Sequence, residues 1–293
     1  MSIATPTAPP AVAPPTPTSS RWSQAPRIAL IVGPLVVLAV GLGYPLAWVV
    51  SRSMTDRDDV FVGGATWSAT LSDPAVHKAV WRTLEIAAYS TLGCVAVGTF
   101  LAFVLAFVPF PGAGGVARII EAVVSLPSFL IPLALGVLFG PVGVVSASTG
   151  HQFTFMSSVT GVVLAEIAFY TPFVVRPLLA AFTQFPTAHI DVASSLGAGP
   201  LRIAGRVILP RVWPALAAAA ALTFLLTLNE FGIVLFTGAK DVMTLPMMIY
   251  TRSMVSSDFA TAAVLATMQL VLSVAVYLGY RAIVARFDSQ TGA

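Results

Sequence analysis

The sequence is poor in charge. Only 9% of its 293 residues are charged, comprising 15 Lys or Arg and 12 Asp or Glu, whereas 57% are hydrophobic. Soluble domains carry about 25% charged residues, so this few charges cannot cover a surface that faces water. The mean hydropathy is +0.90. The composition therefore excludes an ordinary soluble protein and predicts a polytopic membrane protein.

Cysteine and histidine are also scarce. Cys94 is the single cysteine, and it lies in an apolar run where we expect it to pack. A lone thiol makes no intrachain disulfide and no zinc site. The histidines, at 77, 151 and 189, do not have the spacing of metal ligands. We therefore expect no metal site and no cofactor.

Sequence motifs for catalysis are missing as well. The chain has no Gly-x-x-x-x-Gly-Lys-Ser/Thr phosphate loop and no Gly-x-Ser-x-Gly elbow. It is therefore not expected to be an enzyme or to hydrolyse ATP by itself. The net charge of +3 does not indicate a nucleic-acid partner, because the arginines lie at the ends of apolar runs, where they set membrane topology.

Apolar runs long enough to cross a bilayer, which takes about 20 residues, occur six times. The sequence thus predicts an all-α protein with six transmembrane helices. The predicted spans are Ile28–Val50, Leu84–Val108, Ile119–Phe139, Val159–Leu179, Ala215–Phe236 and Ala260–Val284.

The chain divides into three predicted regions. Residues 1–26 are rich in Pro, Thr, Ala and Ser and lack core-forming residues, so we expect a disordered tail. They do not have the order of a signal peptide. Residues 27–80 hold the first span and an outer loop, and residues 81–287 hold the other five spans.

The Lys and Arg residues indicate the orientation. With a cytoplasmic N-terminus, nine of them lie inside and six outside, which favours both termini in the cytoplasm. The inner set is Arg21, Arg27, Arg118, Arg176, Arg202, Arg206, Arg211, Arg281 and Arg286, and the outer set is Arg52, Arg57, Lys78, Arg82, Lys240 and Arg252.

A basic, glycine-punctuated stretch, DVASSLGAGPLRIAGRVILPRVWPAL at 191–216, interrupts this apolar chain. We expect a short helix over Thr187–Leu196 that ends at Gly197, and a turn at Gly199-Pro200. A second short element is expected from Leu201 to Leu209, ending before Pro210. The predicted picture is a helix on the cytoplasmic surface that presents small residues to a partner.

This stretch resembles the signature cytoplasmic loop of ABC importer permeases, which reads Glu-Ala-Ala, three residues, Gly, nine residues, Ile-x-Leu-Pro. Here Asp191, Val192 and Ala193 stand at the first three positions, and Gly197 follows at the family spacing. Val207, Ile208, Leu209 and Pro210 complete the match. The match departs from the family pattern at three positions, where Asp191 replaces Glu, Val192 replaces Ala and Val207 replaces Ile.

The resemblance covers about Trp81 to Arg286 and implies an inner-membrane permease subunit of a prokaryote. It implies separate ATPase subunits that push on a coupling helix within the loop at about 183–213. By this match Asp191 and Ala193 lie in the docking helix, Gly197 makes the turn, and Ile208, Leu209 and Pro210 return the chain to the membrane. A solute-binding protein and a second permease subunit, identical or related, complete the expected assembly.

Four carboxylates fall in or near the spans. Glu85 and Glu121 lie near span ends, where they can reach the interface. Glu166 and Glu230 lie deeper. Glu230 has two open interpretations: it hydrogen-bonds between helices, or it lines the translocation path with Asn229, as Glu166 would. Arg176 is expected to reach the interface or to pair with Asp191 or with a partner's acid.

The stretch TFLLTLNEFGIVLFTGAKDVMTLPMMIY resembles permeases for 2-aminoethylphosphonate within a branch that also serves sulfate, molybdate, thiamine, iron and polyamines. The resemblance implies a phosphonate as solute, with another solute of this branch as the alternative. Glu230 would then bind the amine. A secondary transporter is the rival class, and it predicts an inverted repeat that the sequence does not show.

Overall fold

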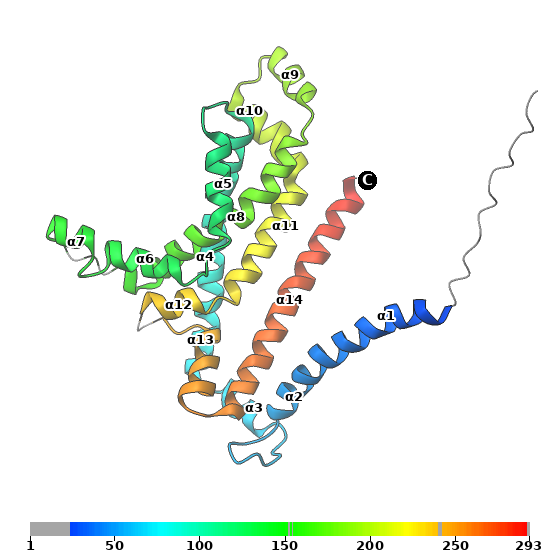
Figure 1. The fold of residues 1–293 in the computed structure, drawn as a ribbon, viewed down its shortest axis with the longest axis vertical. Helices are drawn as coiled ribbons and strands as arrows, with labels where there is room; N and C mark the ends of the chain where they lie inside the picture. Colours follow the sequence, from blue (N-terminus) through cyan, green and yellow to red (C-terminus); the bar gives the residue numbers. More distant parts are fainter. Residues whose placement is uncertain (1–23, 152, 154, 240–241, 292–293) are drawn as a thin grey trace, which may run out of the picture. The chain divides into compact units, whose positions relative to one another are not determined.

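The computed structural model describes residues 24–151, 153, 155–239 and 242–291 (Figure 1). Most of the expected tail at 1–26 lies outside these ranges. The charged residues Arg21, Lys240 and Asp241 also lie outside them. The chain divides into two compact units, Met1–Trp48 and Val49–Ala293. All regular secondary structure of the described residues is helical, apart from an isolated bridge between Thr55 and Phe61.

Six helical segments of the described residues are long and apolar enough to cross a membrane, as predicted. The first consists of α1 (Gln24–Leu38), a π turn (Ala39–Gly43) and α2 (Tyr44–Arg52). Its candidate span, Leu30–Arg52, agrees with the predicted one, and its apolar side chains are largely exposed. Exposed apolar side chains over such a length fit a lipid environment.

The second span begins earlier than expected. After the short α3 (Ala65–Leu71), helix α4 runs from Pro74 to Phe107, ten residues longer at its start than the predicted helix from Leu84. Asp73 caps it by accepting a hydrogen bond from the Ala75 N–H group at 2.8 Å, and Pro74 fits the first helical position. The N-terminus of α4 is therefore set by its capping residues and not by the point where the apolar run begins.

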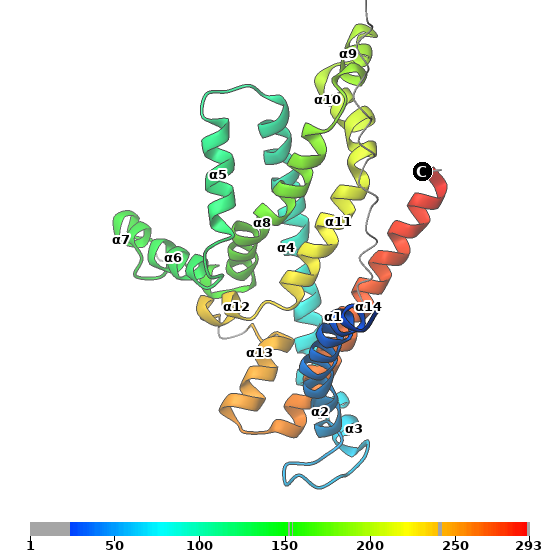
Figure 2. The same cartoon turned by 45° about the vertical axis from the view of Figure 1, so that its right-hand side comes forward.

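The third predicted span, a single helix over Ile119–Phe139, is wrong. The structure has α5 (Ala113–Val123), a break, then α6 (Leu130–Phe139) and α7 (Val144–Thr149), and the candidate span is Leu130–Thr149. Pro127 lies in the break, and it cannot donate the hydrogen bond that a continuous helix needs. Helix α5 contacts α8, and Figure 2 shows α6 and α7 running away from the bundle.

The core forms where α8 (Val159–Thr183) packs against α4 and α11 (Leu209–Leu228). The predicted fourth span, Val159–Leu179, is confirmed with four further residues. Gly98 lets α4 and α8 approach closely, because a Cβ atom at Gly98 would lie 2.7 Å from Cβ of Val174. Cys94 is fully buried at the same contact.

The fifth predicted span, Ala215–Phe236, is wrong at both ends. A continuous helical run over Pro200–Leu228 combines α10 (Pro200–Ile203), a π turn (Ala204–Ile208) and α11. The expected end before Pro210 does not occur, because the π turn bonds the Leu209 N–H group to the carbonyl group of Ala204 and places the proline in the first turn of α11.

The chain then turns at residues 229–231 and forms three more helices. These are α12 (Gly232–Thr237), α13 (Leu245–Tyr250) and, after a π turn at Thr251–Val255, α14 (Phe259–Thr291). The candidate span Phe259–Ala282 lies at the position predicted for the sixth span. In Figures 1 and 2, α13 and α9 (Thr187–Ser195) lie at opposite ends of the bundle of α4, α8 and α11.

Candidate functional site

The loop between α8 and α10 contains the short helix that the sequence predicted. Helix α9 covers Thr187–Ser195, and Gly197 follows it with a positive φ of 80°. The Gly197 N–H group donates to the Ser194 carbonyl group at 2.9 Å, and the Ala198 N–H group donates to Ala193 at 3.0 Å. This pair of bonds is a Schellman motif with glycine at its left-handed position. The glycine of the signature is therefore required by the end of α9.

One side of α9 rests on the protein itself. Ile190 and Ala193 are half-buried against the core, so Ala193 does not lie on the free surface as the sequence suggested. The free surface carries Val192, Leu196 and Leu201, which are 60%, 82% and 90% exposed. Val192 and Leu196 lie one helical turn apart, on α9 and its C-terminal residue, whereas Leu201 lies on α10. Large apolar side chains left this exposed in a loop indicate a contact surface.

The second half of the signature anchors the loop. Ile208 is buried in the main core, Leu209 is half-buried against it, and Pro210 is exposed at the start of α11. Asp191 and Arg176 are both exposed, and no ion pair joins them among the residues that the structure describes. Arg202, Arg206 and Arg211 are exposed too, as expected for side chains at an interface.

Glu230 binds three other parts of the protein. It is 8% exposed and lies in the break between α11 and α12. One carboxylate oxygen accepts hydrogen bonds from the Ile233 N–H group at 2.8 Å and from the Ser128 hydroxyl group at 3.4 Å. The other accepts from the Tyr170 hydroxyl group of α8. The carboxylate thus caps α12 and ties it to the α5–α6 break and to α8.

Asn229 connects the same break to the last span. Its amide oxygen accepts hydrogen bonds from Gln269 at 2.9 Å and from Ser273 at 3.2 Å, both on α14. Its amide nitrogen donates to the Leu225 carbonyl group at 2.8 Å. Asn229 is exposed, unlike Glu230 beside it.

Glu166 is the most deeply buried acid of the spans, at 1% exposed. One of its carboxylate oxygens has no hydrogen-bond partner among the described residues, and neither do the nearby buried hydroxyl groups of Ser90 and Thr91 on α4. Glu85 and Glu121 differ from it. Glu85 pairs with Arg82 at 2.7 Å, and Glu121 is exposed.

A cluster of ion pairs, which was not predicted from the sequence, lies at the end of the bundle opposite α9. Asp258, 2% exposed, accepts a hydrogen bond from Arg57 at 2.9 Å and lies 3.9 Å from the guanidinium group of Arg252. Its carboxylate also caps α14 through the Thr261 N–H group at 3.2 Å. The Ser-Ser-Asp before an apolar helix is the capping signal that predicts this role.

The ionisation of these groups follows from the cluster. Burial alone raises the pKa of Asp258, but the hydrogen bonds from Arg57 and Thr261 outweigh it, so the pKa lies below its ordinary value of 3.8. The same hydrogen bond raises the pKa of Arg57. Both groups are therefore charged at neutral pH.

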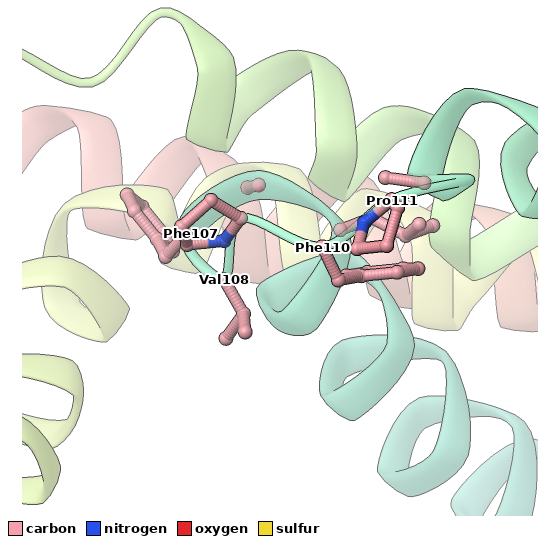
Figure 3. Close-up of a pocket in the computed structure, with 8 residues that line it drawn as sticks. Phe107, Val108, Phe110 and Pro111 are labelled. Carbon is pink, nitrogen blue, oxygen red and sulfur yellow. The ribbon is translucent and has the colours of Figure 1, made fainter.

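A turn with a surface hollow joins α4 to α5. Figure 3 shows Phe107, Val108, Phe110 and Pro111 around this pocket of about 640 Å³. All of its lining comes from one contiguous segment without a charged residue. The pocket therefore brings no chemically active groups together. No group of three or more potential metal ligands occurs in the described part of the chain.

The comparisons with known proteins agree on one class. Residues 95–289 match the family described as "Binding-protein-dependent transport system inner membrane component". PhnU of Salmonella typhimurium, a permease protein named for a 2-aminoethylphosphonate transport system, is 39% identical over 255 residues, which is 85% of this chain and 89% of PhnU. The molybdenum transport permease ModB of Mycobacterium tuberculosis is 30% identical over 88% of this chain and 92% of ModB.

Solved structures show the same fold at low identity. A bacterial ABC transporter that imports alginate has a TM-score of 0.78 at 16% identity, with 90% of this chain and 98% of that chain covered. The MetNI methionine ABC transporter has a TM-score of 0.56 at 19% identity, with 71% and 94% covered.

The six-span fold, with a short surface helix between the fourth and fifth spans, is that of the membrane subunit of an ABC importer. The chain belongs to the family of binding-protein-dependent transport system inner membrane components. It is a multi-pass permease subunit, a transport component and not an enzyme.

Proposed function

We propose that this permease subunit imports 2-aminoethylphosphonate or a related phosphonate. The support is the relationship to PhnU, at 39% identity over most of both chains, against 30% for the molybdenum permease and 29% for a sulfate permease protein of Helicosporidium. Sulfate, molybdate, thiamine, iron and polyamines are the competing solutes. All are tested by the same uptake experiment.

The proposed assembly contains ATPase subunits, an extracytoplasmic solute-binding protein and a second permease subunit, identical or related. A relative of this fold was solved as the alginate transporter "in complex with alginate pentasaccharide-bound periplasmic protein", which supports the binding-protein partner. The proposed location is the inner membrane of a prokaryote with both termini in the cytoplasm. The placement of α9 and of the Asp258 cluster at opposite ends of the bundle agrees with this orientation.

The observation that carries the energy-coupling role is the geometry of α9. The helix lies at one end of the bundle (Figure 1), ends at a left-handed glycine, and exposes Val192 and, at its C-terminus, Leu196. In the proposed mechanism an ATPase subunit binds this apolar surface, with Asp191 at its edge. Because Ile208 and Leu209 pack in and against the core, movement of α9 is passed to α11.

The proposed translocation path runs past Asn229, Glu230 and Glu166. Asn229 is exposed, so solute can reach it, although its amide already bonds Leu225, Gln269 and Ser273. Glu230 is buried and accepts three hydrogen bonds. Binding of the solute amine by Glu230 would need Tyr170 to release it. The alternative is that Glu230 only joins helices.

Uptake by a strain that lacks this gene, with the binding protein intact, tests the proposed solute. The wild-type gene should restore uptake of labelled 2-aminoethylphosphonate, and excess unlabelled sulfate, molybdate, thiamine, iron or polyamine should not compete. If the gene restores uptake of one of those solutes and not of the phosphonate, the proposed solute is wrong.

A further inference from the structure

A pocket at the end of the bundle opposite α9 has a strongly cationic lining. Its volume is about 440 Å³, within the usual range for small-molecule sites of about 300–1,000 Å³. The first turns of α4 form one wall, and α13 with the π turn after it forms the other. Lys78, Arg82 and Arg252 all line it, and no carboxylate does.

The three cations differ in how far they are neutralised. Arg82 donates to Glu85 at 2.7 Å. Arg252 lies 3.8 Å and 3.9 Å from oxygen atoms of Asp73 and Asp258, beyond hydrogen-bond distance, and its guanidinium group makes no hydrogen bond within the described residues. Lys78 is exposed and forms none of the ion pairs found in the described part of the chain.

Arg252 is one-third exposed, and its guanidinium group donates no hydrogen bond within the described residues, so its donors are open to a ligand. Its planar fork of donors matches the oxygen atoms of a phosphonate or phosphate group. Lys78 adds a second charge on the facing wall, and the Ser256 hydroxyl group lies on the lining as a further donor. The free donors of the pocket therefore suit a tetrahedral oxyanion.

Acidic groups beside the pocket suit the other end of a zwitterion. The Asp73 side chain is 35% exposed, and the oxygen that faces Arg252 accepts no hydrogen bond. An ammonium group carried two carbons from a phosphonate would meet Asp73 when the phosphonate meets Arg252. Met248 provides apolar lining for the carbons between them.

We propose that this pocket is an entry site on the permease itself, where Lys78 and Arg252 receive the phosphonate group of an aminoalkylphosphonate before it enters the path between the helices. The inference rests on the proposed solute and on the proposed orientation, which places this end outside the cell. It assigns to the permease a solute contact separate from the binding protein.

Chemical labelling of Lys78 tests the contact without depending on transport. The assembled transporter in membranes is treated with an amine-reactive reagent that does not cross the bilayer, and labelling of Lys78 is measured by mass spectrometry. Both 2-aminoethylphosphonate and ethanolamine carry a primary amine that consumes the reagent, so Lys78 labelling is compared at equal concentrations of the two. Labelling should be about tenfold lower with saturating 2-aminoethylphosphonate than with ethanolamine, which has no phosphonate. The Arg252→Gln variant should need about tenfold more phosphonate for the same protection, the usual effect of losing one charge-assisted hydrogen bond.

Uptake separates this inference from the proposed solute. Lys78→Gln should lower phosphonate uptake, and Lys78→Arg, which keeps the charge, should restore it at equal membrane abundance. If the wild type takes up the phosphonate but Lys78→Gln matches it and labelling is unprotected, the entry site is wrong and the solute stands. If only the binding protein protects Lys78 and free phosphonate does not, the cations dock an acidic protein surface, and the entry site is again wrong.

Discussion

Glu230 accepts a hydrogen bond from the hydroxyl group of Tyr170, which lies 60 positions earlier in the chain. This bond joins the break after the fifth span to the middle of the fourth span. Because both residues are buried, removal of Glu230 leaves the Tyr170 hydroxyl group without this acceptor. Removal of Tyr170, in contrast, leaves Glu230 with Ile233 and Ser128 as donors. The pair therefore gives a direct way to separate a structural from a transport role for Glu230.

Glu230→Ala should destabilise the protein by about 1–3 kcal/mol for each buried group left unpaired, namely the Tyr170 hydroxyl group and the Ile233 N–H group. Glu230→Gln keeps an oxygen acceptor for the Ile233 N–H group, so it should lose much less stability than Glu230→Ala. Thermal unfolding of the purified transporter measures both. Equal stability of Glu230→Ala and the wild type would contradict the capping role, and normal uptake by Glu230→Gln would remove Glu230 from recognition of the amine.

Gly98→Ala should destabilise the contact between α4 and α8, because the new methyl group would meet Val174 at 2.7 Å. Overpacking of this kind costs about 1–3 kcal/mol. Val174→Ala in the same chain removes Cγ1 of Val174, which lies at 2.9 Å, but keeps its Cβ atom at 2.7 Å, so it should recover only a small part of the loss. Gly115→Ala is the matched control, because nothing lies within 4 Å of a Cβ atom there. Thermal unfolding that is unchanged in Gly98→Ala would show that the helices can separate freely.

Gly197→Val should abolish uptake at normal membrane abundance, because a β-branched residue resists the left-handed conformation with a φ of 80° and would misplace α9. Gly197→Asn should retain much of the activity, since asparagine adopts this conformation more readily. Gly205→Ala, in the π turn and with open space around it, is the control. Transport at the wild-type rate by Gly197→Val would refute the coupling role of the loop.

Asp258 should hold the loop between α2 and α3 in place over a wide pH range. A lowered pKa means that the ionised carboxylate contributes stability above its ordinary pKa of 3.8, and that this contribution is lost only as the pH falls through the lower folded-state value. Amide exchange of residues 53–66, corrected for intrinsic rates, should show equal protection at about pH 7 and about pH 4.5 in the wild type. Asp258→Asn should reduce this amide protection at both pH values.

Wild-type protection that falls already at about pH 4.5 would mean that Asp258 has an ordinary or raised pKa. Arg57→Gln is the companion variant. Arg57→Gln leaves the buried carboxylate of Asp258 with the more distant Arg252 as its cation. It should therefore lower the amide protection of residues 53–66 more than Asp258→Asn does.

Hydropathy was sufficient to predict the six spans, because long apolar runs have few alternatives in a membrane. It failed wherever proline or a cap decides a helix end. Pro127 divides the third predicted span although the run is mostly apolar, and Asp73 starts α4 ten residues before the predicted span. Local hydrogen bonding sets these boundaries, and a hydropathy pattern does not contain it.

Helix α9 and its end at Gly197 were predicted, since the capping glycine is a local feature, whereas the expected end before Pro210 was wrong. The partners of Glu230 and Asp258 were not predictable. Ser128 lies 102 positions from Glu230, and Arg57 lies 201 positions from Asp258. Contacts of this range depend on how the helices pack, and a single sequence does not show that packing.

The π turn at Ala204–Ile208 carries one residue more than an α-helical turn would need. Loss of one residue there would restore regular helical bonding without opening a loop. The whole of α11 would then rotate by about 100° and move by about 1.5 Å relative to α9. Single-residue insertions and deletions at this point would therefore change which face of the fifth span meets its neighbours while the helix stays intact. Evolution could in this way re-orient the helix that follows the coupling loop without redesigning the loop.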